Sequence, residues 1–245
     1  MMTNNSYHIY PLGDSAITLD FGNVIDETIT QKIIALFHSL NKKPLTGMIE
    51  AVPAYSSITI YYDVIQLKKL VPANRTVAEW MIEQFEKRVD VFQPESDSES
   101  RQIKIPVCYE KNFAVDIEDL AMAKNISVEK VIQIHTSKTY RVYMLGFLPG
   151  FAYMGEVDEQ IEMPRRMQPR QKVEAGSVGI AGRQTGVYPM AMPGGWQIIG
   201  RTPLTLFEAH PNLPDGKAYE DSICLLHPGD MVQFYSISKH EFESY

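Results

Sequence analysis

The sequence predicts an α+β protein, with an N-terminal two-layer domain of ββαββα type at residues 1–92 and a C-terminal β-barrel at residues 101–245. In the first part, two long amphipathic helical stretches each follow a pair of strand-like runs. In the second part, strand-like runs alternate with glycine turns, since only three of the 15 glycines precede Gly146. Between the parts, residues 93–100 (QPESDSES) offer no apolar side chain for burial, which is typical of a linker or an exposed turn.

The first domain opens with two predicted strands, Tyr7–Pro11 and Ala16–Phe21, on either side of a Gly13-Asp14 turn signal. A second pair, Met48–Val52 and Ser57–Tyr62, has the same strand-like composition. Because a helical stretch follows each pair, we expect two helices on one face of a sheet.

The first predicted helix begins at Asp26 and ends before Pro44 and Gly47. The second begins at Thr76, where Glu79 completes a capping box. Both helices have apolar side chains at intervals of three and four, which indicates one buried face each. These side chains are Ile29, Ile33, Phe37 and Leu40 in the first helix, and Val77, Trp80, Met81, Phe85, Val89 and Phe92 in the second.

The second domain begins with a predicted strand, Gln102–Tyr109, followed by two short helices with Asp116 and Ser127 as their N-caps. Tyr140–Leu145 is the next strand, and short strands then alternate with turns as far as Phe234. This pattern is typical of a closed or rolled β-barrel, and the absence of a fixed repeat excludes a propeller or a solenoid.

Composition argues against several functional classes. The formal net charge is −7 over 245 residues, whereas proteins that bind nucleic acid usually carry a basic excess. Two cysteines, Cys108 and Cys224, are too few for a disulfide framework, and no apolar run reaches the length of a membrane span. We therefore expect a cytoplasmic protein that binds neither nucleic acid nor a membrane.

The standard catalytic and cofactor motifs are missing. The sequence contains no Walker-type phosphate loop, no dinucleotide-binding G-x-G-x-x-G and no G-x-S-x-G nucleophile motif. None of the six histidines has metal-binding spacing, so we expect no metal site. The glycine-rich run at 176–182 has the wrong spacing for a phosphate loop, and it forms either a backbone nest for an anion or closely packed strands.

Residues 145–204 combine aromatic and cationic side chains. Aromatic rings beside glycine or proline make rigid pocket walls, and they also make barrel cores. The aromatic residues predicted to bind substrate are Tyr153, Tyr188 and Trp196. Clustered arginines in an acidic chain clamp a carboxylate or a phosphate, or else they pair with nearby acidic residues. The arginines in question are Arg165 and Arg166, as catalytic candidates, and Arg170 and Arg201, as substrate-binding candidates.

Three uncharged residues complete the candidate site. Gln184 and Thr185 are expected on a tight turn, where they orient a small polar ligand or only shape the turn. His135 follows an apolar helix face and is the third catalytic candidate, as an acid–base group, with a buried core histidine as the alternative.

Several long motifs resemble the family that contains KipI and allophanate hydrolase subunit 1. They are GFLPGFAYMG, AGSVGIAGRQTGVYP, PGGWQIIGRTPLTLF and HPGDMVQF in the second half, and PLGDSAITLDFG and EAVPAYSSITIYYD in the first. The resemblance covers nearly the whole chain. The family's usual Gly-Gly…Gly-Pro-Asp loop is replaced at residues 109–116, so no role of that loop carries over.

The resemblance implies a cyclophilin-like form for the C-terminal barrel. It also implies one component of an ATP-dependent 5-oxoprolinase, which converts 5-oxo-L-proline to L-glutamate. The implied partners are a subunit of the allophanate-hydrolase-subunit-2 type (PxpC-like) and one of the LamB/YcsF type (PxpA-like). ATP, with Mg²⁺, would bind at a site shared with a partner subunit, so the chain would be inactive alone.

Two alternatives within the family stay open. One is a KipI-like inhibitor of the autophosphorylation of a sporulation histidine kinase, gripping the kinase helices in an apolar groove. The other is a subunit of the allophanate hydrolase or urea carboxylase type, although no biotin-carrier Met-Lys-Met occurs in this chain. The sequence does not separate these activities, because all of them belong to one family.

Overall fold

The structure, a computed structural model, describes residues 7–92, 100–209 and 223–245. The chain divides into two compact units, Met1–Glu99 and Ser100–Tyr245. The predicted linker at residues 93–100 lies outside the described residues, apart from Ser100.

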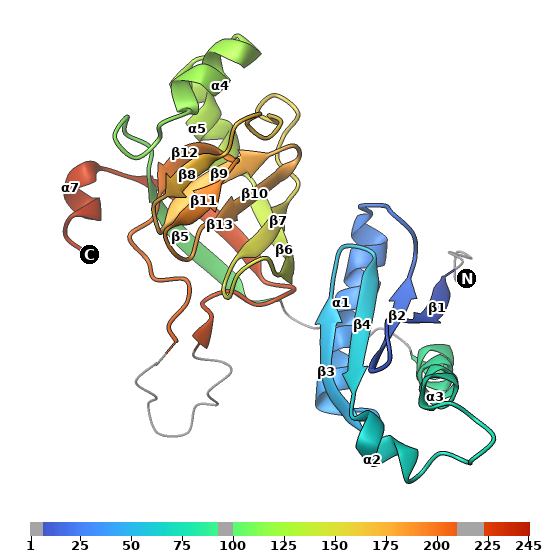
Figure 1. The fold of residues 1–245 in the computed structure, drawn as a ribbon. Coiled ribbons are helices and arrows are strands. Elements are labelled where there is room, and N and C mark those ends of the chain that lie inside the picture. Colours follow the sequence, from blue (N-terminus) through green and yellow to red (C-terminus); the bar gives the residue numbers. More distant parts are fainter. Residues whose placement is uncertain (1–6, 93–99, 210–222) are drawn as a thin grey trace. The chain divides into compact units, whose positions relative to one another are not determined.

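The N-terminal unit contains a four-stranded antiparallel sheet in the order β1-β2-β4-β3 (Figure 1). Its strands are β1 (His8–Pro11), β2 (Ala16–Asp20), β3 (Met48–Pro53) and β4 (Ser57–Tyr62). Ile17 pairs with Ile60, and Leu19 pairs with Ile58, and all four side chains are buried. Alternate residues of a strand point to the same face, so this face of the sheet is apolar.

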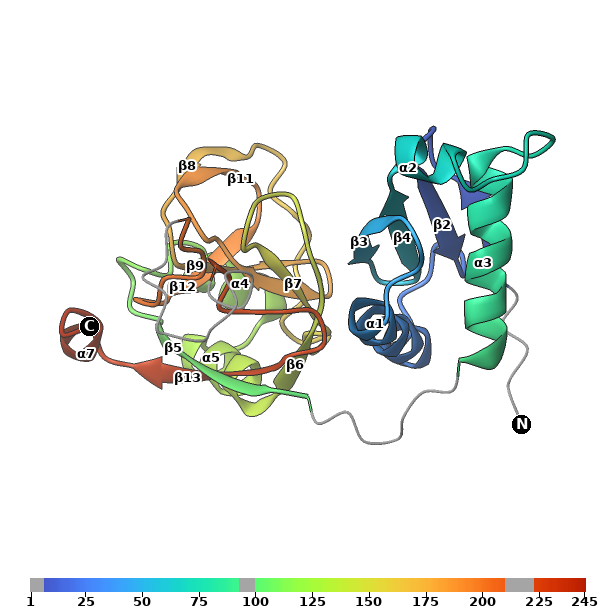
Figure 2. The same cartoon turned by 90° about the horizontal axis from the view of Figure 1, so that it is seen from below.

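Two long helices supply the other layer of this unit, as predicted. They are α1 (Glu27–Lys42) and α3 (Val77–Val91), with a short α2 (Val64–Lys68) between them that the sequence pattern did not indicate. The α1 helix packs against β3 and β4, whereas α3 packs against β1 and β2 (Figure 2). One apolar core joins both helices to the sheet.

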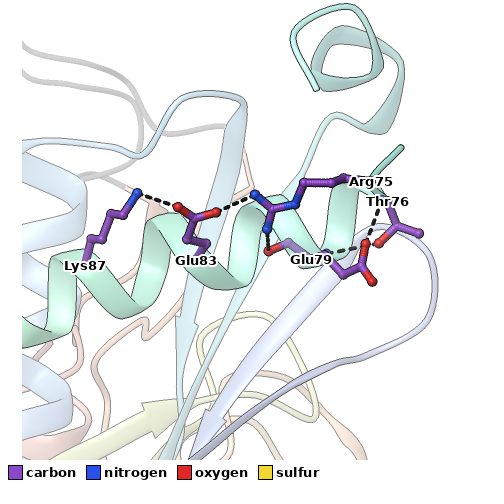
Figure 3. A network of polar contacts seen from close by, with 5 residues as sticks. All are labelled: Arg75, Thr76, Glu79, Glu83 and Lys87. Atoms are coloured by element: carbon purple, nitrogen blue, oxygen red, sulfur yellow. Dashed lines mark hydrogen bonds and ion pairs between the residues drawn. The ribbon is translucent and has the colours of Figure 1, made fainter. Parts of the chain in front are cut away.

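The predicted helix starts are confirmed. The Asp26 carboxylate accepts a hydrogen bond from the backbone N–H of Ile29, at 2.9 Å. At the start of α3, Thr76 and Glu79 form a complete capping box (Figure 3). Further along the same helix, Lys87 and Arg75 both bind the Glu83 carboxylate, and these hydrogen bonds lower its pKa to about 2.

The C-terminal unit is a closed barrel of seven strands in the order β10-β7-β6-β13-β5-β12-β9 (Figure 1). These strands are β5 (Gln102–Cys108), β6 (Thr139–Leu145), β7 (Ala152–Gly155), β9 (Ser177–Ala181), β10 (Gln184–Val187), β12 (Gln197–Arg201) and β13 (Met231–Ile237). The last strand, β13, pairs in parallel with β5 and antiparallel with β6. The predicted α+β fold with a C-terminal barrel is therefore confirmed.

Smaller elements surround the barrel. A two-stranded sheet is formed by β8 (Arg170–Val173) and β11 (Met192–Gly194). Among the described residues of this unit, helices are α4 (Ile117–Lys124), which packs against β12, α5 (Val128–Ser137), which packs against β13, and the short α7 (Lys239–Phe242). Among the described helices, none has the length and apolar character that crossing a membrane requires.

The glycine-rich run at 176–182 contains the strand β9, and every residue from Ser177 to Ala181 is buried. A Cβ atom on Gly179 would lie 3.0 Å from the Cβ of Trp196, so glycine permits close packing at this position. Gly176 has a φ of +80°, and a Cβ there would lie 2.3 Å from the carbonyl oxygen of Thr202. The structure thus favours closely packed strands over the anion nest that was the alternative.

Candidate functional site

The barrel unit contains a pocket with a volume of about 160 Å³. It combines aromatic rings, arginines and backbone at glycine and proline, and its lining is Phe147, Tyr153, Arg165, Arg166, Pro169, Tyr188, Gly194, Gly195 and Trp196. Half of the ten predicted site residues are therefore brought together here. These five are Tyr153, Arg165, Arg166, Tyr188 and Trp196.

The aromatic wall of the pocket is held by a buried ring behind it. Phe151 is 1% exposed, and its ring centroid lies 4.8 Å from that of Tyr153 and 5.4 Å from those of both Tyr188 and Trp196. These are edge-to-face contacts, the favoured geometry for aromatic pairs, and they lock the rings in place. A Cβ atom on Gly194 would lie 2.4 Å from the Tyr188 hydroxyl oxygen, so a larger residue would displace this ring.

The two tyrosine hydroxyls of the wall stay protonated at neutral pH. Burial raises the pKa of Tyr153 and of Tyr188 above the ordinary value. A neutral phenol keeps its proton and can donate a hydrogen bond.

Asp116 connects two of the predicted arginines. Its Oδ1 accepts hydrogen bonds from Arg166 Nη1 at 2.9 Å and from Arg170 Nη2 at 2.5 Å, and the Asp116 side chain is 1% exposed. Its Oδ2 accepts from the backbone N–H of Ile198 at 2.7 Å. Asp116 does precede α4, as predicted, but its side chain makes no capping hydrogen bond, because the two guanidinium groups and Ile198 occupy the carboxylate.

Arg165 differs from its neighbours in sequence. Its guanidinium lies 5.9 Å from the ring centroid of Trp196, in a cation–π arrangement. In the described part of the chain, it makes no ion pair with an acidic side chain. The side chain is exposed at the pocket, so it is the arginine most accessible to an anionic ligand.

His135 lies in the barrel interior. Its ring is fully buried and stacks on Phe234, with ring centroids 4.6 Å apart. Nδ1 lies 2.7 Å from the Tyr109 hydroxyl, and Nε2 lies 3.1 Å from the Thr185 hydroxyl. Burial lowers the pKa of His135 to about 3, so the ring is neutral at ordinary pH.

The hydrogen bonds around His135 have one consistent direction. The Thr185 hydroxyl donates to the carbonyl of Gly179 at 3.1 Å, and it therefore accepts from His135 Nε2–H. Nδ1 is then the acceptor, and the Tyr109 hydroxyl donates to it. Every polar atom in this chain of contacts has a partner, as expected of a structural histidine. The predicted acid–base role has no support from this geometry and stays a prediction.

The other predicted residues lie outside the pocket lining. Gln184 and Thr185 belong to β10 and not to a tight turn, and Thr185 is turned into the barrel, where His135 occupies its hydroxyl. Arg170 meets the site only through Asp116. Arg201, at the end of β12, donates to the carbonyl of Ala175 at 2.7 Å. Their predicted substrate-binding roles stay predictions.

One feature of the site has no counterpart among the predicted residues. It is Asp116, whose arginine partners follow it by 50 and 54 positions, so no local spacing indicates the contact. Phe147, an aromatic residue beside glycine and so a predicted wall or core residue, does line the pocket, and it is 67% exposed with a left-handed φ of +69°. A non-glycine residue with positive φ is uncommon and often lies near a functional site.

Neither Cys108 nor Cys224 is among the residues that line the pocket. Within residues 7–92, 100–209 and 223–245, no three His, Cys, Asp or Glu side chains are grouped as metal ligands. Cys108 and Cys224 are both free, and burial raises the pKa of each thiol, which disfavours a reactive thiolate.

Comparison with known proteins decides the family. Residues 7–215 match the model of the carboxyltransferase domain, subdomain C and D. The chain belongs to this family. The B-subunit of the 5-oxoprolinase of Bacillus subtilis is 40% identical to it over 98% of this chain and 96% of the relative. The predicted family resemblance is thereby confirmed.

Two further similarities agree with this assignment. The B-subunit of the 5-oxoprolinase of Escherichia coli O157:H7 is 36% identical over 92% of this chain and 94% of the relative. A crystal structure of the protein TTHA0988 is 31% identical, with a TM-score of 0.74, and the match covers 91% of this chain. The chain spans 40% of that larger protein.

Proposed function

We propose that this chain is the PxpB-type component of an ATP-dependent 5-oxoprolinase, which converts 5-oxo-L-proline to L-glutamate with hydrolysis of ATP. The observation that carries the proposal is the 40% identity to the B-subunit of a 5-oxoprolinase over nearly the full length of both chains. The partners are a PxpC-like and a PxpA-like subunit, and the chain alone is inactive. Because the reaction consumes ATP, we place the complex in the cytoplasm.

The chemistry explains why ATP is required. The lactam of 5-oxoproline is an unstrained amide that resists hydrolysis. Transfer of a phosphoryl group from ATP to the lactam oxygen makes the carbonyl carbon a better electrophile, and water then breaks the C–N bond and releases phosphate. Negative charge develops on oxygen atoms in both steps, and cationic or backbone donors stabilise it.

The lining of the pocket suits the substrate. Its aromatic rings and its exposed arginine match a five-membered ring with one carboxylate. Trp196 and Tyr188 offer apolar faces to the ring, and Arg165 offers a charge to the carboxylate. ATP, with Mg²⁺, then binds at a site that a partner subunit completes, in agreement with the missing Walker motif.

The test is ATP hydrolysis that depends on 5-oxoproline, measured with the three purified subunits singly, in pairs and together. We expect ADP and glutamate in equal amounts from the complete set only. The same assay with urea in place of 5-oxoproline should release no ADP. A complete set that is inert with 5-oxoproline, or a set that is fully active without this chain, would overturn the proposal.

A further inference from the structure

We propose that Asp116 positions the arginines of the pocket, and that Arg165 makes the direct contact with the carboxylate of a small cyclic substrate. This inference rests on the proposed function and assigns different roles to the guanidinium groups of Arg165, Arg166 and Arg170. Asp116 does not touch the ligand in this proposal, so it is a positioning residue.

The charges around the pocket call for an anion. Among the described residues, Arg166 and Arg170 share the Asp116 carboxylate as their ion-pair partner and Arg165 has none, so the three cations exceed their paired carboxylate by two charges. A carboxylate ligand at the exposed Arg165 guanidinium would add the negative charge that this cluster lacks.

Arg165 is held between two anchored neighbours. On one side, the Gln197 side chain donates to the carbonyl of Pro164 at 2.8 Å. On the other side, the backbone N–H of Arg166 donates to the carbonyl of Gly195 at 2.7 Å. The backbone of Arg165 is therefore fixed while its guanidinium stays accessible beside Trp196. This arrangement preorganises one charged group toward the pocket.

Asp116 connects this segment to the barrel wall. Its backbone N–H donates to the carbonyl of Ile198 at 2.9 Å, and its Oδ2 accepts from the Ile198 N–H at 2.7 Å. The remaining oxygen, Oδ1, binds Arg166 and Arg170. One buried carboxylate thus ties the Arg166 and Arg170 guanidinium groups to β12, and its loss would release Arg166, the neighbour of Arg165 in the pocket lining.

The experiment measures kcat and KM for 5-oxoproline in the reconstituted complex. The variants are Arg165→Gln and Asp116→Asn, with matched controls in the same barrel. Arg183→Gln removes an arginine that pairs with Glu156 instead of lining the pocket. Asp230→Asn changes a second buried aspartate of the same kind. Like Asp116, Asp230 accepts hydrogen bonds from an arginine side chain, that of Arg101, and from a backbone N–H, that of His227.

We expect Arg165→Gln to raise KM by about 10- to 100-fold with little change in kcat, since the carboxylate takes no part in the bond changes at the lactam carbonyl. Asp116→Asn should raise KM by about tenfold, and both controls by about twofold or less. The inhibition constant of 2-pyrrolidinone, the same ring without a carboxylate, should stay unchanged in Arg165→Gln. A general loss of structure would instead weaken the binding of both compounds.

The outcomes separate the two proposals. An inert wild-type complex would overturn the proposed function, and this inference with it. An active wild-type complex in which Asp116→Asn behaves like Asp230→Asn would overturn the positioning role alone. Equal weakening of 5-oxoproline and 2-pyrrolidinone in Arg165→Gln would exclude the carboxylate contact.

Discussion

The two units of the protein use charged side chains in different ways. In the N-terminal unit, Glu79 and Glu83 bind partners within ten residues along one helix, and their carboxylates remain exposed. In the barrel, Asp116 binds arginines 50 and 54 positions away, and Asp230 binds Arg101 at a separation of 129. Short-range contacts stabilise an element that already forms, whereas buried long-range contacts decide which segments meet. The second kind is therefore the one that builds the pocket.

The largest expected effect concerns the buried histidine of the barrel. His135→Ala removes a ring from the core and leaves the Tyr109 and Thr185 hydroxyls without their partner. We expect a loss of about 3–5 kcal/mol in the free energy of unfolding. The measurement is urea unfolding followed by Trp196 fluorescence in a Trp80→Phe background, because these are the two tryptophans of the chain.

The matched control for this prediction is His240→Ala on the exposed α7, for which we expect a loss of less than about 0.5 kcal/mol. If His135→Ala does not fold, Thr185→Val tests the same network, with an expected loss of about 1–3 kcal/mol. Equal stabilities of the His135 and His240 variants would show that the buried network is dispensable.

The next effect is a pH dependence of the barrel. The pKa of His135 is about 3 in the folded protein and 6.5 for an ordinary histidine, so the unfolded chain binds one more proton between these values. Stability is therefore lost as the pH falls below about 6.5, by about 1.4 kcal/mol per pH unit. Urea unfolding between about pH 5 and pH 6.5 isolates this contribution, since ordinary carboxyl groups titrate at lower pH. The dependence should flatten in His135→Gln, and an unchanged slope would contradict the assignment.

A smaller effect is expected at the start of α3. Thr76→Ala removes the hydroxyl that accepts from the Glu79 N–H at 3.2 Å, and we expect a loss of about 1 kcal/mol. Thr76→Ser keeps the hydroxyl and serves as the control. Trp80 lies in this helix, so its fluorescence in a Trp196→Phe background follows the unit directly. A Thr76→Ala loss as large as that of His135→Ala would remove the contrast between the two units.

The smallest effect is expected at the exposed carboxylate of α3. Hydrogen bonds from Lys87 and Arg75 lower the pKa of Glu83 to about 2, below its ordinary value of 4.5. Its contribution is therefore present above about pH 4.5 and is lost as the pH falls toward 2. Glu83→Gln should lower Tm by less than Thr76→Ala does, and added salt should abolish the difference from wild type. A salt-independent loss would indicate a packing role for this side chain.

The sequence by itself determined the elements that depend on neighbouring residues. Helix caps and apolar helix faces are patterns of neighbouring residues. The helices α1 and α3 could therefore be predicted from the sequence, with their starts at Asp26 and Thr76. The long motifs predicted the family, and the aromatic and arginine residues of one segment supplied five of the nine residues that line the pocket.

Only the tertiary structure decided the contacts of Asp116, Thr185 and His135. Asp116 resembles an ordinary N-cap until the closing barrel brings Arg166 and Arg170 to it. Thr185 is a ligand-binding candidate from the sequence, and strand pairing turns its side chain inward toward His135. Sequence patterns report interactions over a few residues, whereas barrel closure joins segments that are 50 or more positions apart, and local spacing carries no signal for such contacts.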